Sequence, residues 1–533
     1  MAHFTYFKSP EFLRVSLLLF INVVHSKWRQ YVNEVVPAPY LDEVFHVPQV
    51  QAYWYGKWSQ WDPKITTPPG LYGFSYLINS FRGYMDPTMK PTTDEWRYVN
   101  AVLLYMVLIV LYILVAVGKR TVVSDNVLQR EFNIILFPLL FFFSALFYTD
   151  LFSVFTVVLA QTVWTAGLST DGWKKFLFQT LHLVAGLLSL SARQTNIFWV
   201  AVYLGGLQAV ATIKTKVGVE KLHDPPISQA SFQDFSITSL SLVQSAIPIL
   251  PRILLDLWPQ ICLLGSFAGF VTWNGGVVLG DKGNHIATIH LTQMLYIWPL
   301  IIFFSWPVIL PLFSDLAALR RRLPKLITTA TALAIMFNIV HFNTIVHPFT
   351  LADNRHYVFY VFALLRRHWI IKYAVIPVYY ICGWLVLTAL GGAPESQPDQ
   401  KTIRILHSAD TVSVSDVLVW LLATSLSLVT APLVEPRYFI VPWLMWRLAV
   451  PEHQPQSKAQ QKFSQLEKGK STRGKQDSQS TFVLQTALTT LAGYSAYIEL
   501  AWYLTINIVT GYIFLYKGFE WPQEPGNVQR FMW

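Results

Sequence analysis

The chain has 533 residues, of which 53% are hydrophobic and only 13% are charged. A soluble globular protein carries about a quarter charged residues, so this chain lacks the side chains needed to cover a water-facing surface. The composition excludes a disordered chain, a coiled coil and a secreted disulfide scaffold, and it predicts an all-α polytopic membrane protein. The net charge of +10 is typical of basic cytosolic loops, so we expect no nucleic-acid partner.

Apolar runs recur along the whole chain, which we treat as a single polytopic domain, residues 1–533. Because about 20 apolar residues cross a bilayer as a helix, we expect a bundle of about 14 transmembrane helices. Lys8 and Arg14 precede the first run without a small-residue cleavage site, so we interpret that run as a span and not as a signal peptide. The expected spans are residues 15–24, 98–117, 132–148, 151–168, 176–190, 197–213, 253–271, 293–314, 326–346, 369–390, 416–434, 437–449, 483–498 and 500–516.

Lysine and arginine gather in alternate loops, which the positive-inside rule places in the cytosol. Two of these loops are long connections: residues 214–250, and a basic tract rich in Gln, Lys and Ser, residues 451–480, which we expect to be disordered. The lumenal side then holds the longest loop, residues 34–97. Arg366 and Arg367 are an exception to the rule, because the count of spans places them on the lumenal side.

The lumenal loop 34–97 carries two adjacent carboxylates, Asp42 and Glu43, and a histidine one helical turn later, His46. Such a group supplies a general base and a side chain that orients it. Two alternatives stay open, because either carboxylate suits the base and acidic residues also stabilise the start of a helix. Trp61 and Asp62 follow in a stretch rich in aromatic residues and proline, which a flexible spacer would not use.

The other lumenal loops collect cationic and imidazole side chains, accompanied by Asp150 and Asp353. Charges at a membrane edge are costly and usually functional, and several cations together suit a phosphate or pyrophosphate. The alternative for each arginine is a salt bridge that ties the lumenal loops together. The side chains in question are Arg193, Lys282, His285, Arg355, His356 and Arg437.

Histidine near carboxylates also raises the question of a metal site. His285 and His290 are five residues apart, and no glutamate stands between them as in a helical zinc motif. Gly275, Gly276 and Gly280 precede them, but no Gly-Lys-Ser/Thr follows as it would in a phosphate-binding loop. We therefore expect no metal and no cofactor.

Seven segments, in their order along the chain, resemble the dolichyl-phosphate-glucose-dependent α-1,2-glucosyltransferase family. This family adds the terminal, third glucose to the lipid-linked oligosaccharide of the endoplasmic reticulum. The resemblance covers essentially the whole chain, and its specific motifs are Leu-Ala-Asp-Asn-Arg-His-Tyr at 351–357 and Gln-Arg-Phe-Met-Trp at 529–533. The other segments are residues 42–49, 60–67, 193–196, 280–282 and 437–442.

The resemblance implies the C-type glycosyltransferase fold, a membrane bundle whose first lumenal loop carries the catalytic acid. It implies an inverting transfer of glucose from dolichyl β-phosphoglucose to the diglucosylated oligosaccharide on dolichyl pyrophosphate, the last step of N-glycan precursor assembly. The protein is then expected in the endoplasmic reticulum membrane, among its lipids, with the active site facing the lumen.

Roles for individual residues follow from the resemblance. Asp42 is the expected base, with Glu43 second. The donor phosphate is expected on Arg355 and His356, helped by Lys282, Arg437 and Arg193, and the supporting or acceptor-binding residues are His46, Trp61, Asp62, Asp150, His285 and Asp353. The alternative function is a polytopic transporter of a lipid-linked or phosphorylated substrate. Its spans would contain ionisable residues and broken helices, whereas the charges here gather at one membrane edge.

Overall fold

The computed structural model describes residues 10–86, 88, 91–118, 125–283, 288–392, 411–431, 433–452 and 479–533, and these residues are mainly helical. Within them, nine helices are long and apolar enough to cross a membrane. The chain is therefore a polytopic helical membrane protein, as its low charge content predicted. The nine are Thr93–Gly118, Asp150–Gly167, Gly172–Ala192, Gln194–Val217, Phe232–Asp256, Gln293–Ser314, Leu326–Asn343, Ile371–Ala389 and Ser495–Tyr516.

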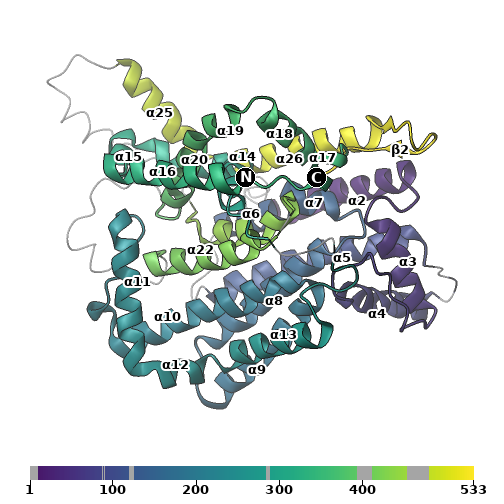
Figure 1. Cartoon of the computed structure of the whole chain (residues 1–533), viewed down its shortest axis with the longest axis horizontal. Coiled ribbons are helices and arrows are strands. Elements are labelled where there is room, and N and C mark those ends of the chain that lie inside the picture. Colours follow the sequence, from purple (N-terminus) through teal and green to yellow (C-terminus); the bar gives the residue numbers. More distant parts are fainter. Residues whose placement is uncertain are drawn as a thin grey trace, which may run out of the picture.

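Many of the long helices run roughly side by side, so the bundle has two opposite ends (Figure 1). We call one of them the site end; it lies on the right of Figure 1 and holds α3 (Glu43–Trp54), α4 (Gly70–Met85), α17 (Pro348–Ala352) and strand β2 (Val528–Gln529). Segments from the start, middle and end of the chain therefore meet there.

The first predicted span and the long loop after it fold into four helices. α2 (Pro10–Val35) extends well beyond the run at 15–24, and α5 (Thr93–Gly118) follows α4. Asp94 and Glu95 lie in the first turn of α5, where acidic side chains stabilise the positive end of the helix dipole. The loop 34–97 is thus mostly helical.

The span predicted at 132–148 is not formed. Two short helices take its place, α6 (Asp125–Ile135) and α7 (Pro138–Phe143). Pro138 lacks a backbone N–H and disfavours helical geometry at Phe137, which has φ −51° and ψ 125°. Residues 129–150 are all buried, so this segment is core and does not face lipid.

A hairpin of α8 (Asp150–Gly167) and α9 (Gly172–Ala192) connects the two ends of the bundle. The two helices are joined at Thr156, whose hydroxyl donates to the Ser189 hydroxyl at 3.3 Å. The chain then turns at the site end and returns, partly as a π-helix, through η1 (Gln194–Asn196), η2 (Phe198–Tyr203) and α10 (Leu204–Val217).

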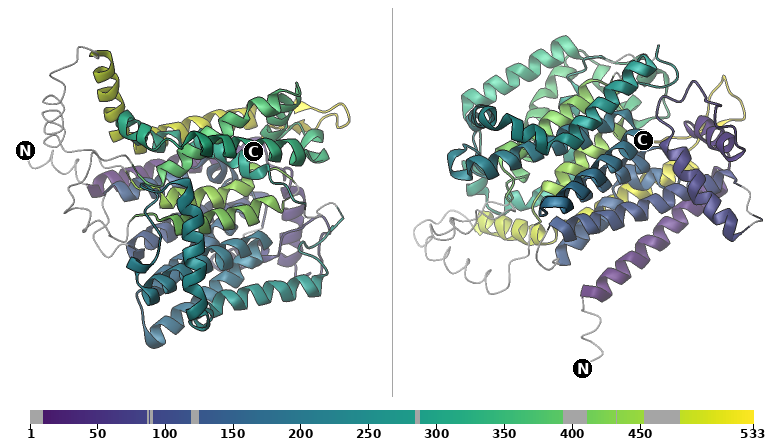
Figure 2. Two further views of the ribbon diagram at one scale, coloured as in Figure 1. Left: turned by 60° about the vertical axis from the view of Figure 1, so that its left-hand side comes forward. Right: turned by 90° about the horizontal axis from the view of Figure 1, so that it is seen from below.

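The connection predicted at 214–250 contains a helix where we expected a linker. α11 (Phe232–Ala246) begins with a capping box of Ser231 and Asp234, and it runs across the direction of α8 and α10 (Figures 1 and 2). Its exposed apolar residues Leu240 and Val243 lie three residues apart on one face. The many serines of this stretch concealed that face. The surrounding elements are η3 (Val219–Lys221), η4 (Ile247–Ile249), α12 (Leu250–Asp256) and α13 (Trp258–Asn274).

The C-terminal half continues as a series of helices and ends in a small hairpin. The predicted span 437–449 becomes a 3-10 turn followed by ten residues of helix, too short to cross a bilayer. Most of the predicted tract 451–480 lies outside the described residues. The elements are α14 (Gln293–Ile309), η5 (Leu310–Ser314), α15 (Leu316–Arg321), α16 (Leu326–Asn343), α18 (Tyr357–Arg366), α19 (Ile371–Ala374), α20 (Ile376–Ala389), α22 (Val414–Val429), η6 (Pro436–Phe439), α23 (Ile440–Ala449), α25 (Gln479–Gly493), α26 (Ser495–Tyr516) and β1 (Phe519–Glu520), which pairs antiparallel with β2.

Candidate active site

Asp42 stands at the N-terminal cap of α3, in a tightly held turn. The preceding residue, Leu41, has φ 53° and is the one non-glycine residue with positive φ in the described part of the chain. Left-handed backbone at a residue with a side chain costs about 1–3 kcal/mol and persists where the surroundings fix it. Here the backbone N–H of Asp42 donates to the Tyr148 hydroxyl at 3.2 Å. The Asp42 side chain remains 43% exposed.

Glu43, the neighbouring carboxylate, is fully buried and fully engaged. Arg97 donates to both of its oxygens, from Nε at 2.8 Å and from Nη2 at 2.5 Å. The backbone N–H groups of Tyr40 and Phe147 donate to the same carboxylate at 3.0 and 2.7 Å. Glu43 therefore ties the start of α3 to α5 and to the segment before α8, and no oxygen of it faces an open space.

Arg437, in the turn η6, is the centre of the acidic cluster at the site end. It donates from Nη1 to Asp42 Oδ2 at 3.0 Å and from Nη2 to Glu435 Oε2 at 2.7 Å. Asp150 Oδ2 lies 3.8 Å from the same Nη1. The guanidinium also lies over the ring of Tyr148, 5.3 Å from its centroid. Three carboxylates thus share one buried arginine.

Arg193 supplies the second cation of this cluster from the turn after α9. Its Nη2 donates to Asp150 Oδ1 at 2.9 Å and to the Thr149 hydroxyl at 3.1 Å. The next residue, Gln194, donates to the carbonyl of Thr66 at 2.7 Å. The turn at 193–194 therefore joins the start of α8 to the loop between α3 and α4.

The charges of the cluster set the protonation of its titratable groups. Burial alone would raise the pKa of Asp42, but the charge of the adjacent Arg437 and its hydrogen bond lower it below the usual value. Burial lowers the pKa of His46, so the imidazole is neutral at pH 7. Its Nδ1 lies 2.5 Å from the Tyr72 hydroxyl. Asp42 is therefore an ionised, partly exposed carboxylate next to a neutral imidazole.

A second group of site residues is fixed by the end of the chain. Arg355 binds Asp353 with two parallel hydrogen bonds of 2.9 and 2.8 Å. Its third nitrogen donates to Gln529 at 3.0 Å. The backbone of Met532 pairs with this loop on both sides, donating to the Arg355 carbonyl at 2.9 Å and accepting from Tyr357 at 3.1 Å. His356 Nε2 lies 3.7 Å from Asp353 Oδ2.

The loop that carries Lys282 packs against the loop between α3 and α4. Gly280, with φ 64°, approaches so closely that a Cβ there would collide with the Pro63 carbonyl. The backbone N–H of Asp281 donates to that carbonyl at 2.7 Å. The Lys282 side chain is exposed and donates to the carbonyl of Asn274. His285 lies outside the described residues.

Trp61 and Asp62 lie beside the cluster on the same loop. The Trp61 ring meets the Tyr72 ring edge-on at 6.0 Å, and its buried indole N–H has no hydrogen-bond partner in the part of the chain that the structure describes. Asp62 accepts from the backbone of Lys64 at 2.9 Å, and its own N–H donates to Gln49. The unpartnered indole is a hydrogen-bond donor held next to the cluster.

The structure brings Asp42, Asp150, Arg193 and Arg437 together, with His46 and Tyr148 against them. It places Arg355, His356 and Asp353 in the neighbouring group held by the last residues of the chain. Sequence reasoning missed Arg97 and Tyr148. The signal for Arg97 was its place at the start of an apolar run, because a charge at a membrane edge needs a partner.

The helical spans and this one-sided cluster define a class: a polytopic membrane protein with a carboxylate–arginine site at one membrane edge. The chain belongs to the DIE2/ALG10 family, whose model matches residues 36–448. This confirms the resemblance drawn from the seven sequence segments.

Individual relatives match over almost their whole length. A protein of Aspergillus fumigatus is 40% identical, over 96% of this chain and 97% of its own. One of Emericella nidulans is 39% identical, over 95% and 96%, and one of Mus musculus is 29% identical, over 94% of each chain. All three are named Dol-P-Glc:Glc(2)Man(9)GlcNAc(2)-PP-Dol α-1,2-glucosyltransferase. These names favour the enzyme over the transporter alternative. No solved structure matches the chain.

Proposed function

We propose that this protein transfers glucose from dolichyl β-phosphoglucose to the diglucosylated lipid-linked oligosaccharide, forming an α-1,2 linkage. Membership of the DIE2/ALG10 family and the names of the full-length relatives support this activity. The donor is a β-linked phosphosugar and the product an α-glucoside, so the anomeric carbon inverts. A single displacement achieves this without a covalent glycosyl-enzyme intermediate.

Asp42 is the proposed general base for the 2-hydroxyl of the acceptor sugar. Of the two adjacent carboxylates, it alone is partly exposed, whereas the Glu43 oxygens are both occupied by Arg97. The hydrogen bond from Arg437 fixes the Asp42 carboxylate and leaves its Oδ1 side for the incoming hydroxyl. A positioned base contributes about 10²–10⁴-fold to the rate. This contrast between the two carboxylates is the observation that carries the assignment.

The departing phosphate is proposed to lie among the cations of the site end. Stabilising its charge requires donors held in place before the reaction. Arg355, His356 and Lys282 are the proposed contacts outside the acidic cluster, with Arg437 and Arg193 within it. Of these side chains, His356 is the strongest candidate for a phosphate contact. Asp353 already binds Arg355 with two hydrogen bonds, whereas it lies 3.7 Å from His356 Nε2 and makes no close hydrogen bond to it.

The acceptor is proposed to bind along the first lumenal loop. The indole N–H of Trp61 and the hydroxyl of Thr67 are buried and find no hydrogen-bond partner among the described residues, and sugar hydroxyls would satisfy both. Asp62 and His46 lie on the same loop and are proposed to support this subsite. The arrangement, with the base on the first loop of a helical membrane bundle, supports a C-type glycosyltransferase fold, set in the endoplasmic reticulum membrane with the site facing the lumen.

The direct test is transfer by the purified full-length protein, given dolichyl phosphate glucose and a diglucosylated lipid-linked acceptor. The expected product carries one additional glucose, released by an α-1,2-specific glucosidase, and the Asp42→Asn variant yields no more than about 1% of it. Absence of product with a monodisperse, correctly inserted protein would overturn the proposal. So would a product with β configuration at the new bond.

A further inference from the structure

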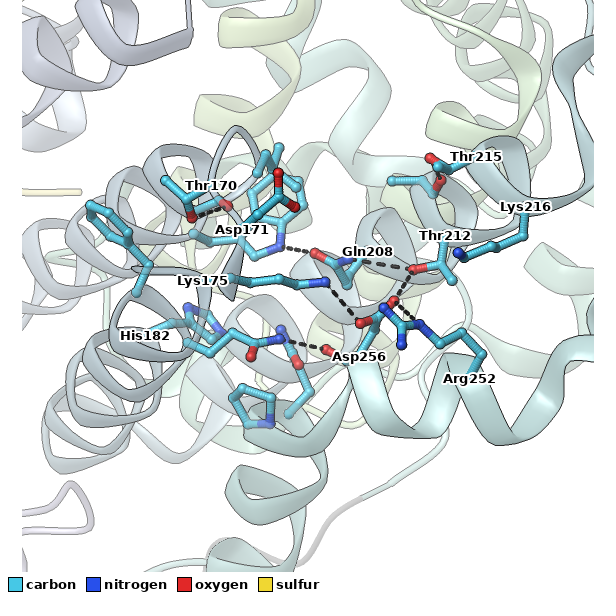
Figure 3. A pocket seen from close by; sticks show the side chains of 18 residues that line it. Thr170, Asp171, Lys175, His182, Gln208, Thr212, Thr215, Lys216, Arg252 and Asp256 are labelled. Atoms are coloured by element: carbon cyan, nitrogen blue, oxygen red, sulfur yellow. Dashed lines mark hydrogen bonds and ion pairs between the residues drawn. The ribbon is translucent and has the colours of Figure 1, made fainter. Parts of the chain in front are cut away.

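A second polar site lies at the end of the bundle opposite the site end. α8 begins with Asp150 in the acidic cluster and ends at Gly167, which lines a cavity of about 280 Å³ (Figure 3). A helix rises about 1.5 Å per residue, so the 18 residues of α8 separate the two places by about 27 Å. This cavity therefore belongs to the other membrane face and takes no part in the proposed transfer.

Charged side chains surround the mouth of the cavity. Lys175 donates to Asp256 Oδ1 at 2.8 Å, and Arg252 Nε lies 3.5 Å from Oδ2 of the same carboxylate, so both cations converge on it (Figure 3). Lys216 is exposed on the same wall. These three cations outnumber the two lining carboxylates, Asp171 and Asp256. The mouth therefore suits a group with one negative charge, such as a phosphodiester.

The inner wall of the cavity carries a buried acceptor, the side-chain oxygen of Gln260. Gln260 is 4% exposed. Its Oε1 has no hydrogen-bond partner among the described residues, and Gln260 lines the cavity. His182, 1% exposed, lies on the same wall, with its Nδ1 3.2 Å from the Ala160 carbonyl. Buried acceptors left unpaired are costly, so this wall favours a ligand with N–H or O–H donors.

Large apolar side chains surround this polar cavity. Phe176 is 62% exposed and Leu255 is 67% exposed, and each is adjacent in sequence to a residue that lines the cavity. Trp173, 71% exposed, lies two residues from the lining residues Asp171 and Lys175. Aromatic residues in the first turns of a membrane helix mark the interface between headgroups and hydrocarbon. A ligand at this position therefore has apolar surface on its outer side and a polar end within the cavity.

We propose that this cavity, lined by Lys175, His182, Lys216, Arg252 and Gln260, binds the headgroup of a glycerophospholipid that carries hydrogen-bond donors beyond its phosphate. The phosphodiester lies between the cations of the mouth. The donors of the headgroup reach Gln260 on the inner wall, and the acyl chains lie against Trp173 and Phe176. The volume of the cavity, about 280 Å³, is sufficient for a lipid headgroup but too small for the acyl chains as well.

Phosphatidylethanolamine and phosphatidylcholine provide a matched pair of probes, because they differ only in N–H groups replaced by N–CH3. Native mass spectrometry of the full-length protein, with each lipid added at equal acyl composition, measures the two affinities. We expect phosphatidylethanolamine to bind about tenfold more tightly, the effect of one or two net hydrogen bonds. Equal affinity for the two lipids would overturn the proposal. It would mean that water, and not a headgroup, hydrogen-bonds to the inner wall.

Variants separate the two parts of the site. The Gln260→Met substitution removes the acceptor of the inner wall, and it is expected to reduce the preference for phosphatidylethanolamine while phosphatidylcholine binds as before. The Lys216→Ala/Arg252→Ala double variant is expected to weaken both lipids. Lys174→Ala is the matched control, since Lys174 is an exposed cation on the same helix turn outside the cavity. Unchanged binding in the double variant would contradict the phosphate assignment.

Competition distinguishes a lipid from a soluble phosphate ester. Free glycerophosphoethanolamine presents the same donors and the same phosphodiester without acyl chains. We expect it to compete at least about tenfold more weakly than the lipid, because the contacts of the chains with Trp173 and Phe176 are missing. Equal competition would overturn the lipid assignment in favour of a water-soluble ligand.

Discussion

Asp42 and Glu43 are adjacent in sequence but have opposite surroundings, which separates their roles. One carboxylate is partly exposed beside Arg437, and the other is buried in a two-fold hydrogen-bonded pair with Arg97. The Asp42→Asn variant should lose at least about 10²-fold in kcat while its thermal unfolding is unchanged. Turnover assays and thermal unfolding of the same preparations check this.

Glu43→Gln is the companion variant, and its expected defect is in stability. Removing one partner of a buried ion pair leaves the other charge uncompensated and costs about 3–5 kcal/mol. Its unfolding temperature should therefore fall clearly, and the protein that remains folded should keep turnover. If the Glu43→Gln protein were stable but inactive and the Asp42→Asn protein active, Glu43 would be the base and Asp42 would have the structural role.

The pH dependence of transfer tests the contact between Asp42 and Arg437. Because Arg437 helps to hold the pKa of Asp42 below its usual value, the base stays ionised as pH falls and protonates only at low pH. The Arg437→Gln variant lacks the positive charge that opposes the effect of burial, so the pKa of Asp42 rises. The acidic limb of kcat/KM should then move to higher pH. The Arg437→Lys variant keeps the charge, so its acidic limb should shift less. An identical acidic limb in the unmodified protein and in both variants would exclude Asp42 as the titrating group.

The pairing of carboxylates with arginines bears on metal dependence. Asp42 and Asp150 face Arg437 and Arg193, and Asp353 faces Arg355. A carboxylate already paired with a cation is a poor ligand for a divalent ion, which would meet the positive charge of the arginine. We expect transfer to survive EDTA. Loss of activity on chelation, restored by Mg²⁺ or Mn²⁺, would contradict this.

At the scale of elements, the last residues of the chain act as a strand beside the Arg355 loop. The Met532→Pro variant removes the N–H that donates to the Arg355 carbonyl. We expect faster hydrogen exchange across residues 353–357 and a rise in KM for the donor. Met532→Leu keeps the backbone bonds and the apolar side chain, so it should behave like the unmodified protein. Equal exchange in both variants would show that other contacts hold this loop.

The sequence predicted that the charged loops share one end of the bundle, because alternation of basic loops assigns each loop a side. It did not predict which side chains pair there. Asp42 and Arg437 are 395 residues apart, and no local pattern links them. The preference for Asp42 over Glu43 came from the resemblance. Its physical basis, the burial of Glu43 by Arg97, required the structure.

Errors in the predicted elements have local causes. Proline at 138 divides an apolar run that hydropathy alone reads as continuous. The helix α11 was taken for a linker, because its serines lower the mean hydropathy although its apolar residues recur at helical spacing. In both cases the average hydropathy of a segment did not reveal the order of its residues, on which the secondary structure depends.

At the scale of the molecule, the two ends of the bundle should lie on opposite sides of the membrane. Single cysteines at Arg366, near the site end, and at Lys221, beyond α10, test this in a protein whose Cys262 and Cys382 are replaced. On sealed microsomes, an impermeant thiol reagent should label position 221 directly and position 366 only after permeabilisation. Both positions are exposed, so access depends on the membrane. Direct labelling of both would contradict this topology.

The contact between Tyr40 and Arg530 has a consequence for biosynthesis. The Tyr40 hydroxyl donates to the Arg530 carbonyl at 2.9 Å and accepts its N–H at 2.7 Å, across 490 residues of chain. Contacts so distant in sequence form late, because nearly every span must be synthesised and inserted first. A ribosome-bound chain lacking its last residues would carry Asp42 and Arg437 yet leave the Arg355 loop unsupported. Activity should therefore arise only after Arg530 and Met532 have been synthesised.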